Sequence, residues 1–218
     1  GNRHGTGKMT FANGNMYEGE FKDDMKHGKG KFTYANGDVY EGNYADDEEH
    51  GKGKLTHHEG DVYEGDWKDG NYNGNGKMTY KDGTIYEGGW KDGGRHGEGK
   101  LTYKGKNPID VVFETDDEND EYLISGEGTF FKIKLKNNVE YQEFHGKIEN
   151  SKVTGSGKCK FASGNIYEGD FKDDKMHGKG KYTFANGDIY EGDFKDGKMH
   201  GKGVLRGPDG TIIHSGDW

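Results

Sequence analysis

Apolar and polar positions alternate along this chain with the two-residue period of a β-strand. In the stretch DVYEGNY, Tyr40, Gly42 and Tyr44 fall on one face and the residues between them fall on the other. The stretch GKGKL that follows places its two glycines and Leu55 on one face and its two lysines on the opposite face. The two stretches, with a turn between them, predict a β-hairpin.

The hairpin pattern repeats along the chain. The triplet Tyr-Glu-Gly begins every 23 residues, at Tyr17, Tyr40, Tyr63 and Tyr86, and again at Tyr167 and Tyr190. The element Gly-x-Gly begins nine times, 23 residues apart except for two steps of 29, at Gly5, Gly28, Gly51, Gly74, Gly97, Gly126, Gly155, Gly178 and Gly201. A fixed period of this length indicates a repeat architecture in which each unit packs mainly on its neighbours.

Turn signals separate the units. Asn-Gly or Asp-Gly dipeptides stand between alternating stretches, at Asn13-Gly14, Asn36-Gly37, Asp82-Gly83, Asn186-Gly187 and Asp209-Gly210. Such dipeptides are the strongest short-range signal for a tight hairpin turn, and no helix of ordinary length is indicated. The predicted fold class is all-β: an elongated, single-layer, twisted ribbon of about nine consecutive β-hairpins.

The repeats divide the chain into three segments of one continuous domain. Residues 1–103 and 155–218 are regular, with a degenerate last repeat, whereas residues 104–154 are irregular and lose the Tyr-Glu-Gly triplet. An acidic loop is inserted there, with Asp116, Asp117, Glu118, Asp120 and Glu121. We expect a solvated loop, with docking of a basic partner as the alternative, and first proteolytic cleavage between Thr115 and Tyr122.

Glycine normally weakens a strand, so its recurrence at one phase indicates that another group approaches the backbone closely. We expect Tyr40 and Tyr44 of one hairpin to cover the Gly-x-Gly element of its neighbour, and the same to hold in the other repeats. The aromatic residues predicted to pack in this way, or to bind a partner, are Tyr17, Tyr40, Tyr44, Tyr63, Trp67, Tyr86, Trp90, Tyr167, Phe171, Tyr190 and Phe194.

Composition agrees with this prediction only through the aromatic residues. Glycine supplies 41 of 218 residues, and Leu, Ile, Val and Phe together supply 32, which by itself is typical of a disordered chain. The 14 Tyr, 11 Phe and 3 Trp residues are far more than a solvated tail carries and can replace the missing aliphatic core. The single cysteine, Cys159, excludes an intramolecular disulfide framework.

Charge restricts the classes of partner. The formal net charge of -9 argues against a nucleic-acid binder, and it disfavours an anionic membrane except through a local patch. No apolar run is long enough to span a bilayer as a helix, and no signal-like segment opens the chain. Because the chain begins and ends within the repeat pattern, we expect it to be part of a longer protein.

Two rows of polar residues could suggest chemistry. Histidines recur at one phase, at His4, His27, His50, His96, His177 and His200. Neighbours in this row should lie about 10 Å apart, too far to share a metal ion, and the adjacent His57 and His58 should point to opposite faces. The recurring glutamates share one environment and face lysines, so cross-strand pairing is expected rather than glycoside hydrolysis. We therefore predict no catalytic residues, no cofactor and no bound metal.

The repeat unit YEGDFKDGKMHGKG, from Tyr190 to Gly203, resembles the MORN (membrane occupation and recognition nexus) repeat, and close copies begin at Tyr17, Tyr40 and Tyr167. The resemblance covers nearly the whole chain and weakens in the units that begin at Gly97 and Gly126. It implies a β-ribbon scaffold, which the family uses alone in cytoskeletal and ciliary proteins such as radial-spoke heads. The family also attaches it to junctophilins, plant phosphoinositide kinases and a histone lysine methyltransferase.

Three functions remain open at this stage. The first is a non-catalytic scaffold that binds other proteins of a larger assembly, through an aromatic groove or an exposed edge strand. The second is a tether on anionic phospholipid, and the third is the regulatory repeat region of a larger lipid kinase or lysine methyltransferase. We favour the scaffold, in the cytoplasm, at the cytoskeleton or the ciliary axoneme, and leave homo-oligomerisation open.

Overall fold

The structure, a computed structural model, describes residues 2–116, 121–134 and 140–218. The chain divides into two compact units, Gly1–Tyr122 and Leu123–Trp218, and each is described by itself. All regular secondary structure within the described ranges is β-strand. The predicted all-β class is confirmed.

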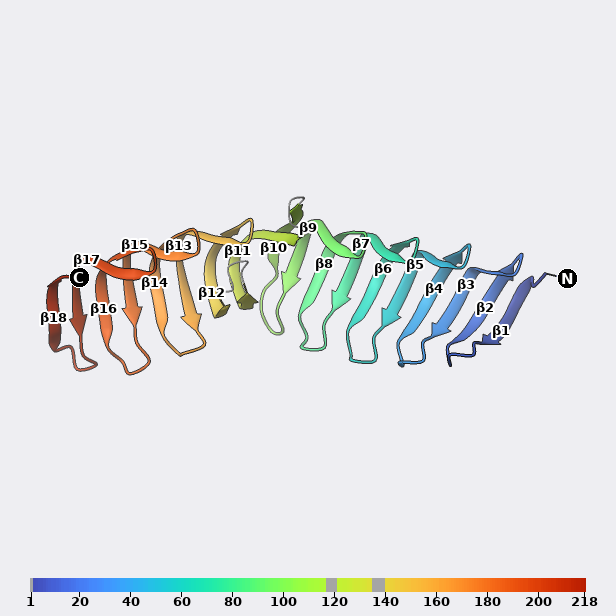
Figure 1. Cartoon of the computed structure of the whole chain (residues 1–218), viewed down its shortest axis with the longest axis horizontal. Helices are drawn as coiled ribbons and strands as arrows, with labels where there is room; N and C mark the ends of the chain where they lie inside the picture. The colour runs from blue at the N-terminus through green and yellow to red at the C-terminus, as the bar shows by residue number, and fades with distance from the viewer. Residues whose placement is uncertain (1, 117–120, 135–139) are drawn as a thin grey trace. The chain divides into compact units, whose positions relative to one another are not determined.

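The strands of the first unit are β1 (Gly5–Thr10), β2 (Met16–Lys22), β3 (Met25–Thr33), β4 (Val39–Ala45), β5 (Glu48–Thr56), β6 (Val62–Lys68), β7 (Asn71–Thr79), β8 (Ile85–Lys91), β9 (Gly94–Thr102) and β10 (Ile109–Asp116) (Figure 1). Each pairs antiparallel with the next strand along the chain. This order is that of consecutive hairpins, as the sequence predicts.

The strands of the second unit are β11 (Glu121–Lys134), β12 (Glu140–Glu149), β13 (Lys152–Phe161), β14 (Ile166–Lys172), β15 (Lys175–Thr183), β16 (Ile189–Lys195), β17 (Lys198–Arg206) and β18 (Ile212–Asp217). They also pair antiparallel in chain order. Asp116 ends β10 and Glu121 begins β11, whereas Asp117, Glu118 and Asp120 lie outside the described residues. The docking role and the early cleavage of this acidic loop therefore stay predictions.

The two glycines of each Gly-x-Gly element have different tasks. In β3, Gly30 pairs with Gly19 of β2, but the next pair is His27 with Glu20, so two residues of β3 bulge out of the ladder. Gly28 starts this bulge with φ +61°, a left-handed conformation that glycine adopts without strain. The first glycine is thus required by the backbone rather than by a covering ring.

The second glycine lies under a tyrosine of its own hairpin. A Cβ atom added to Gly42 would lie 2.6 Å from the Cα of Gly53, and the phenol of Tyr40 covers both glycines. The prediction that Tyr40 covers the neighbouring hairpin is therefore wrong, because its ring turns along its own hairpin. The second aromatic position does reach back: the ring of Phe21 lies 3.4 Å from the Cβ position of Gly7 in the preceding strand.

The tight two-residue turns lie within the hairpins rather than at the Asn-Gly signals. Asp23 and Asp24 join β2 to β3 with φ values of +50° and +69°, the left-handed pair that such a turn requires. The Asn-Gly signals mark longer loops, in which Phe11 donates its N–H to Asn15 O at 2.9 Å and Gly14 adopts φ +88°. The turns were predicted, but their lengths were assigned to the wrong ends of the strands.

Hydrogen bonds join neighbouring hairpins at both ends of the strands. At the turn end, Asp47 N–H donates to Lys26 O at 3.1 Å and Lys26 N–H donates to Asp47 Oδ1 at 2.7 Å. At the loop end, His58 N–H donates to Asp38 Oδ1 at 2.8 Å. These bonds satisfy backbone groups that the strands leave unpaired, so each sheet is held at its centre and along both borders.

We expect Asp38→Ala to lower the free energy of unfolding by about 1.5 to 3 kcal/mol, because it removes a carboxylate that holds a backbone N–H and the His58 ring. The hydrogen bond from the His58 backbone keeps the pKa of Asp38 well below its usual range. A carboxyl with a lowered folded-state pKa stabilises above its unfolded pKa, so the effect should shrink as the pH falls below about 4.

Asp188→Ala is the matched control for this prediction. Asp188 occupies the same repeat position, and the amide of Asn186 donates to it at 2.9 Å as that of Asn36 does to Asp38 at 3.0 Å. The next loop, however, has Pro208 where the earlier one has His58, and proline has no N–H to donate. Urea unfolding should show a loss below about 0.5 kcal/mol for this variant; equal losses for the two would show that the link between loops contributes nothing.

Candidate functional site: the two faces of the repeat sheet

The aromatic residues predicted from the sequence form the interior of each unit. Each is at most 6% exposed, and this holds for Tyr17, Tyr40, Tyr44, Tyr63, Trp67, Tyr86, Trp90, Tyr167, Phe171, Tyr190 and Phe194. Their strands bury one face because successive side chains of a strand point to opposite sides. Little ring area is left for a partner to touch, and direct partner binding by these residues stays a prediction.

The rings form a continuous row within each unit, which we call the ring row. Tyr40 contacts Tyr44 of its own strand, with centroids 5.2 Å apart, and Trp67 of the next hairpin at 4.9 Å, both edge to face. In the second unit, Tyr167 contacts Phe194 of the next hairpin at 5.0 Å in the same geometry. Such pairs add about 0.5 to 1.5 kcal/mol beyond area burial, so the ring row fastens each hairpin to the next.

The hydroxyl of each central tyrosine explains why the position is not phenylalanine. Tyr40 donates to Asn43 O at 2.9 Å and Tyr63 donates to Asp66 O at 2.8 Å, three residues ahead in the same strand. These carbonyls lie where the bulge interrupts the ladder, so the hydroxyl replaces a missing strand partner. Burial raises the pKa of Tyr17 to about 12, and it raises the pKa of the other central tyrosines too.

We expect the protein to be unstable to alkali in a way that tyrosine absorbance reports. A phenol with a raised folded-state pKa stabilises fully below its unfolded pKa near 10, and this stability is lost as the pH rises toward the folded value. Absorbance at 295 nm should therefore remain well below that of 14 ionised tyrosines until the β-sheet circular dichroism collapses above about pH 11. Full ionisation near pH 10 with the sheet intact would contradict the buried hydroxyl network.

Two side-chain pairs, here called the lid pairs, cross over the ring row of the first unit. Tyr34 donates its hydroxyl to Glu49 Oε1 at 3.0 Å, and His57 Nε2 lies 3.2 Å from the Tyr72 hydroxyl. The ring of Tyr72 stacks on Tyr63 with centroids 3.8 Å apart. Each pair joins a residue at the loop end to one at the turn end, fifteen residues later. The aromatic groove expected from the sequence is therefore spanned in these repeats.

His57 and His58 do not point to opposite faces, so this prediction is wrong. Their Nδ1 atoms lie 3.5 and 2.8 Å from the two oxygens of Asp38, because both residues belong to a loop rather than to a strand. Within the described ranges, no group of three or more His, Cys, Asp or Glu side chains is arranged to hold a metal ion. That the purified protein carries no stoichiometric metal stays a prediction, which elemental analysis would test.

Two of the periodic histidines contact the turn of the next hairpin. His4 Nε2 lies 3.3 Å from Asp23, and His50 Nδ1 lies 3.8 Å from Asp69. His4 lies just before β1 and His50 lies in β5, and each is paired with a turn of the following repeat, so the two pairs link neighbours along the turn border.

The opposite face carries a row of alternating lysines and glutamates. In register, Lys31 lies between Glu18 and Glu41, and its Nζ is 2.9 Å from Glu41. Further pairs are Lys8–Glu18 at 3.3 Å, Lys158–Glu168 at 3.2 Å and Lys181–Glu191 at 3.5 Å. The predicted cross-strand pairing is confirmed, although exposed pairs of this kind stabilise by only about 0 to 1 kcal/mol each.

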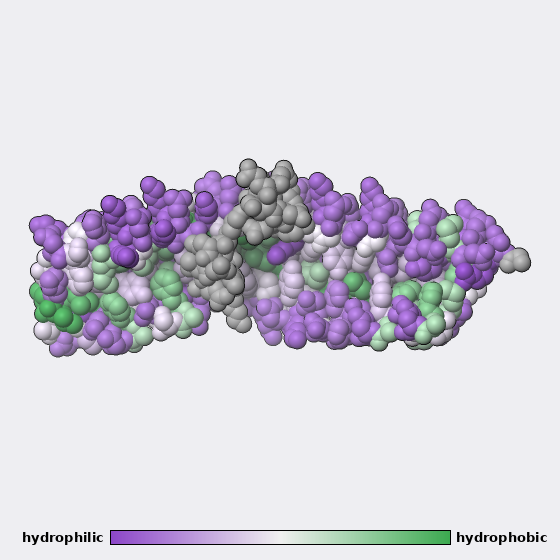
Figure 2. Space-filling view, viewed as in Figure 1, coloured by the Kyte–Doolittle hydropathy of each residue, from purple (hydrophilic) through white to green (hydrophobic). Residues whose placement is uncertain are grey.

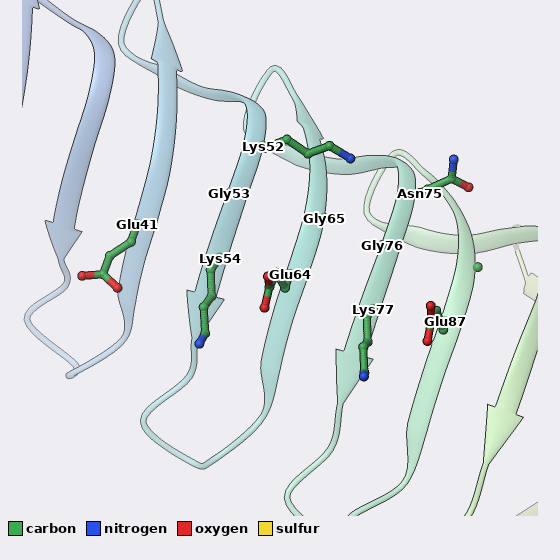
Figure 3. A pocket seen from close by; sticks show the side chains of 11 residues that line it. Glu41, Lys52, Gly53, Lys54, Glu64, Gly65, Asn75, Gly76, Lys77 and Glu87 are labelled. Carbon is green, nitrogen blue, oxygen red and sulfur yellow. The ribbon is translucent and has the colours of Figure 1, made fainter.

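A hollow of about 780 Å³ runs across this polar face in the first unit, and we call it the polar trough. Its floor is glycine backbone and its walls are polar side chains: Glu41, Lys52, Lys54, Glu64, Asn75, Lys77 and Glu87 (Figure 3). A second hollow of about 760 Å³ shares Glu41 and Lys52 with it and continues toward β2. Together they follow the sheet across seven strands.

Four wall residues of the polar trough differ from their equivalents elsewhere. Lys54 faces Glu64 and Lys77 faces Glu87 in register, yet neither pair forms an ion pair within 4 Å among the described residues. Figure 3 shows the four side chains side by side along the same wall. In the sequence these residues are ordinary members of a regular lysine and glutamate row, and nothing in it indicates which cross-strand pairs form no ion pair.

Other residues that could suggest chemistry are accounted for by packing. Cys159 is 1% exposed, and burial raises the pKa of its thiol to about 12, which leaves it a poor nucleophile.

On β18, Ile212 and Ile213 are 55% and 57% exposed, and Figure 2 shows such hydrophobic surface in patches between hydrophilic residues. Among the described residues there is no helix that could cross a membrane.

Comparison with solved structures finds remote likenesses. The TCP10 domain of Danio rerio CPAP aligns with 98% of this chain and 89% of its own, at 13% identity and a TM-score of 0.35. The TCP domain of Drosophila melanogaster SAS-4, solved with a proline-rich motif of Ana2, aligns with 95% of this chain and 86% of its own, at 12% identity and a TM-score of 0.29. Comparison with curated proteins finds no match.

Comparison with protein families finds the MORN repeat. Its family model matches eight segments, at residues 1–16, 17–39, 40–62, 63–85, 86–107, 144–166, 167–189 and 190–212. Six of the eight segments begin at the central tyrosine of a hairpin, and the unmatched interval between residues 107 and 144 falls in the irregular region that the sequence predicts. Because the matches span well over half of its residues, the chain belongs to the MORN repeat family.

Proposed function

We propose that this chain is a non-catalytic scaffold that binds a partner protein along the polar trough of its first unit. The observation that carries the proposal is that two cross-strand pairs, Lys54 with Glu64 and Lys77 with Glu87, form no ion pair among the described residues. They lie on the wall of a hollow of about 780 Å³. Charges that are not paired within the chain can pair with those of a partner at a smaller free-energy cost than paired ones, because no internal ion pair has to be broken first. The ring row, by contrast, is committed to packing.

The shape of the polar trough favours a polypeptide over a small molecule. Its walls are two rows of side chains that run across successive strands, about 4.8 Å apart, so the hollow is long and shallow rather than enclosed. Both signs of charge alternate along one wall, which favours a partner segment that carries Lys or Arg together with Asp or Glu. Six equivalent glutamates in one environment do not provide the distinct acid and base that catalysis needs.

Charge also disfavours the alternative of a phospholipid tether. Residues 1–122 carry 26 acidic and 16 basic residues, and residues 123–218 carry 14 and 15. An anionic bilayer attracts a surface in which basic residues dominate. On the polar face one row of lysines is interleaved with glutamate, and in the other row Lys52 and Lys179 are paired with Asp66 and Asp193. We place the scaffold in the cytoplasm, at a cytoskeletal or ciliary assembly, as membership of the family implies; imaging of the endogenously tagged chain tests this.

The experiment compares two doubly substituted chains in quantitative affinity purification from native cells. Lys54→Glu/Lys77→Glu reverses the unpaired wall lysines, whereas Lys158→Glu/Lys181→Glu makes the same change of charge at the same repeat position in the second unit. A partner of the polar trough should be lost from the first variant and retained by the second. Equal retention would exclude the trough as the site, and enrichment of no protein would count against a scaffold.

A further inference from the structure

A further hollow lies on the aromatic face, at the start of the first unit. It has a volume of about 330 Å³ and lies over β1 to β3. Its apolar lining comes from Met9, Phe11, Phe21 and Phe32, and charged side chains form its rim. Because neighbouring side chains of a strand point to opposite faces, this hollow and the polar trough lie on opposite sides of the sheet.

The repeat pattern explains why the aromatic face is open here. The lid pairs Tyr34–Glu49 and His57–Tyr72 span the ring row in the next two repeats. The equivalent residues 23 positions earlier are Phe11 and Lys26, and a phenyl ring cannot accept or donate the bond that would join them. The Lys26 ammonium lies instead over the rings of Phe32 and Tyr44, 4.9 Å from each centroid.

The protein itself indicates what fits over its ring row. Two repeats further on, the ring of Tyr72 stacks on Tyr63 with centroids 3.8 Å and planes 18° apart, and it contacts Trp67 and Trp90 edge to face. An aromatic side chain therefore fills the equivalent groove when the chain supplies one. In the first repeat the chain supplies lysine at that position, and the hollow remains.

The chemistry of the hollow also favours an aromatic ring over an aliphatic group. Arg3 and Lys26 hold their cations 5.1 and 4.9 Å from the ring centroids of Phe21 and Phe32. A further ring inserted between these groups would gain edge-to-face contacts with the phenylalanines and a cation–π contact with the rim. An aliphatic side chain would gain only the area burial.

We propose that this hollow is an anchor site for one aromatic side chain of a partner protein. Buried aromatic anchors in pockets of this kind carry a large share of the energy in many protein interfaces. The anchor site does not depend on the polar trough, since it uses other residues on the other face. If both are correct, the first unit can hold two partner segments at once.

The probe is N-acetyl-tyrosinamide, with N-acetyl-leucinamide as the aliphatic control, and the readout is the NMR signal of the Met9 methyl group, which lies in the hollow. We expect the tyrosine probe to shift this signal in a saturable way with a dissociation constant on the order of 1 mM, as for a small single-residue ligand. The leucine probe should bind at least about fivefold more weakly. No saturable shift, or equal binding of the two probes, would overturn the proposal.

The decisive variant is Phe11→Tyr/Lys26→Glu, which installs the first lid pair one repeat earlier. It should close the hollow and weaken the tyrosine probe at least about tenfold, while Lys22→Glu, an exposed substitution with the same change of charge as Lys26→Glu, should leave binding unchanged. Undiminished binding to the closed variant would overturn the proposal. Should that variant not fold, nuclear Overhauser contacts between the probe ring and the Met9 methyl of the unaltered protein decide, since their absence excludes the site.

Discussion

Gly99→Ala is expected to lower the free energy of unfolding of the first unit by about 3 kcal/mol or more. A Cβ atom on Gly99 would lie 2.5 Å from Cε2 and 2.7 Å from the hydroxyl of Tyr86, closer than atoms approach in folded proteins. Tyr86 cannot move aside, because it is fully buried and its ring contacts Trp90 and Phe113 at 5.4 and 5.2 Å. The new methyl group must therefore distort the β8–β9 hairpin, which carries both residues.

Gly97→Ala, two residues away in the same strand, is the matched control. Gly97 has nothing within 4 Å of its Cβ position, but its φ of +68° is left-handed, so alanine there should cost only about 1 to 2 kcal/mol of backbone strain. Hydrogen exchange of the β8 and β9 amides measures the destabilisation by each variant, and so compares the steric clash of Gly99→Ala with the backbone strain of Gly97→Ala. If Gly99→Ala costs no more than Gly97→Ala, the tyrosine does not lie on the glycine as described.

Tyr63→Ala is expected to destabilise the first unit by about 3 to 5 kcal/mol, the usual result of truncating a buried aromatic residue. The ring is fully buried, stacks on Tyr72 at 3.8 Å and meets Trp67 and Trp90 edge to face at 5.4 and 5.2 Å. Its removal leaves a cavity beneath a lid pair and breaks the ring row between two hairpins. Thermal melts together with hydrogen exchange in β6 to β8 would measure the loss.

Two companion variants divide this loss into its parts. Tyr63→Phe keeps the ring but leaves Asp66 O without its donor, and should cost about 1 to 2 kcal/mol. Glu64→Ala changes an exposed, unpaired residue of the opposite face and should cost less than about 1 kcal/mol. Equal losses for Tyr63→Ala and Glu64→Ala would show that the assignment of the two faces is wrong.

The sequence predicts the architecture because one pattern is repeated many times. Alternation around Tyr40 identifies its buried face, and the 23-residue period transfers that assignment to the other repeats. Details that depend on backbone geometry are harder to predict. Gly28 and Gly30 look equivalent in sequence, yet one starts a bulge and the other lies under Tyr17, because a two-residue register shift falls between Gly30 and His27.

The candidate sites were only partly predictable, because they depend on how side chains meet across the sheet. The sequence shows Lys54 and Glu64 as members of a regular row, but whether their tips meet depends on rotamers that alternation does not determine. The pairing of Tyr34 with Glu49 requires knowing that a loop end and a turn end fifteen residues apart face each other across a ring. Neither relation has a local signal, although each could be sought once the repeat length is known.

The alternating row of lysine and glutamate restricts how such a protein can change in length. In the regular repeats, lysine comes from a Gly-x-Gly strand and glutamate from a Tyr-Glu-Gly strand, as at Lys31 and Glu41, although Val204 replaces the lysine opposite Glu191. Gain or loss of a whole hairpin keeps opposite charges adjacent and each tyrosine above its glycines. Gain or loss of one strand would set like charges against each other, about 4.8 Å apart, and would leave a ring without a glycine beneath it. The array can therefore be lengthened or shortened only in steps of two strands.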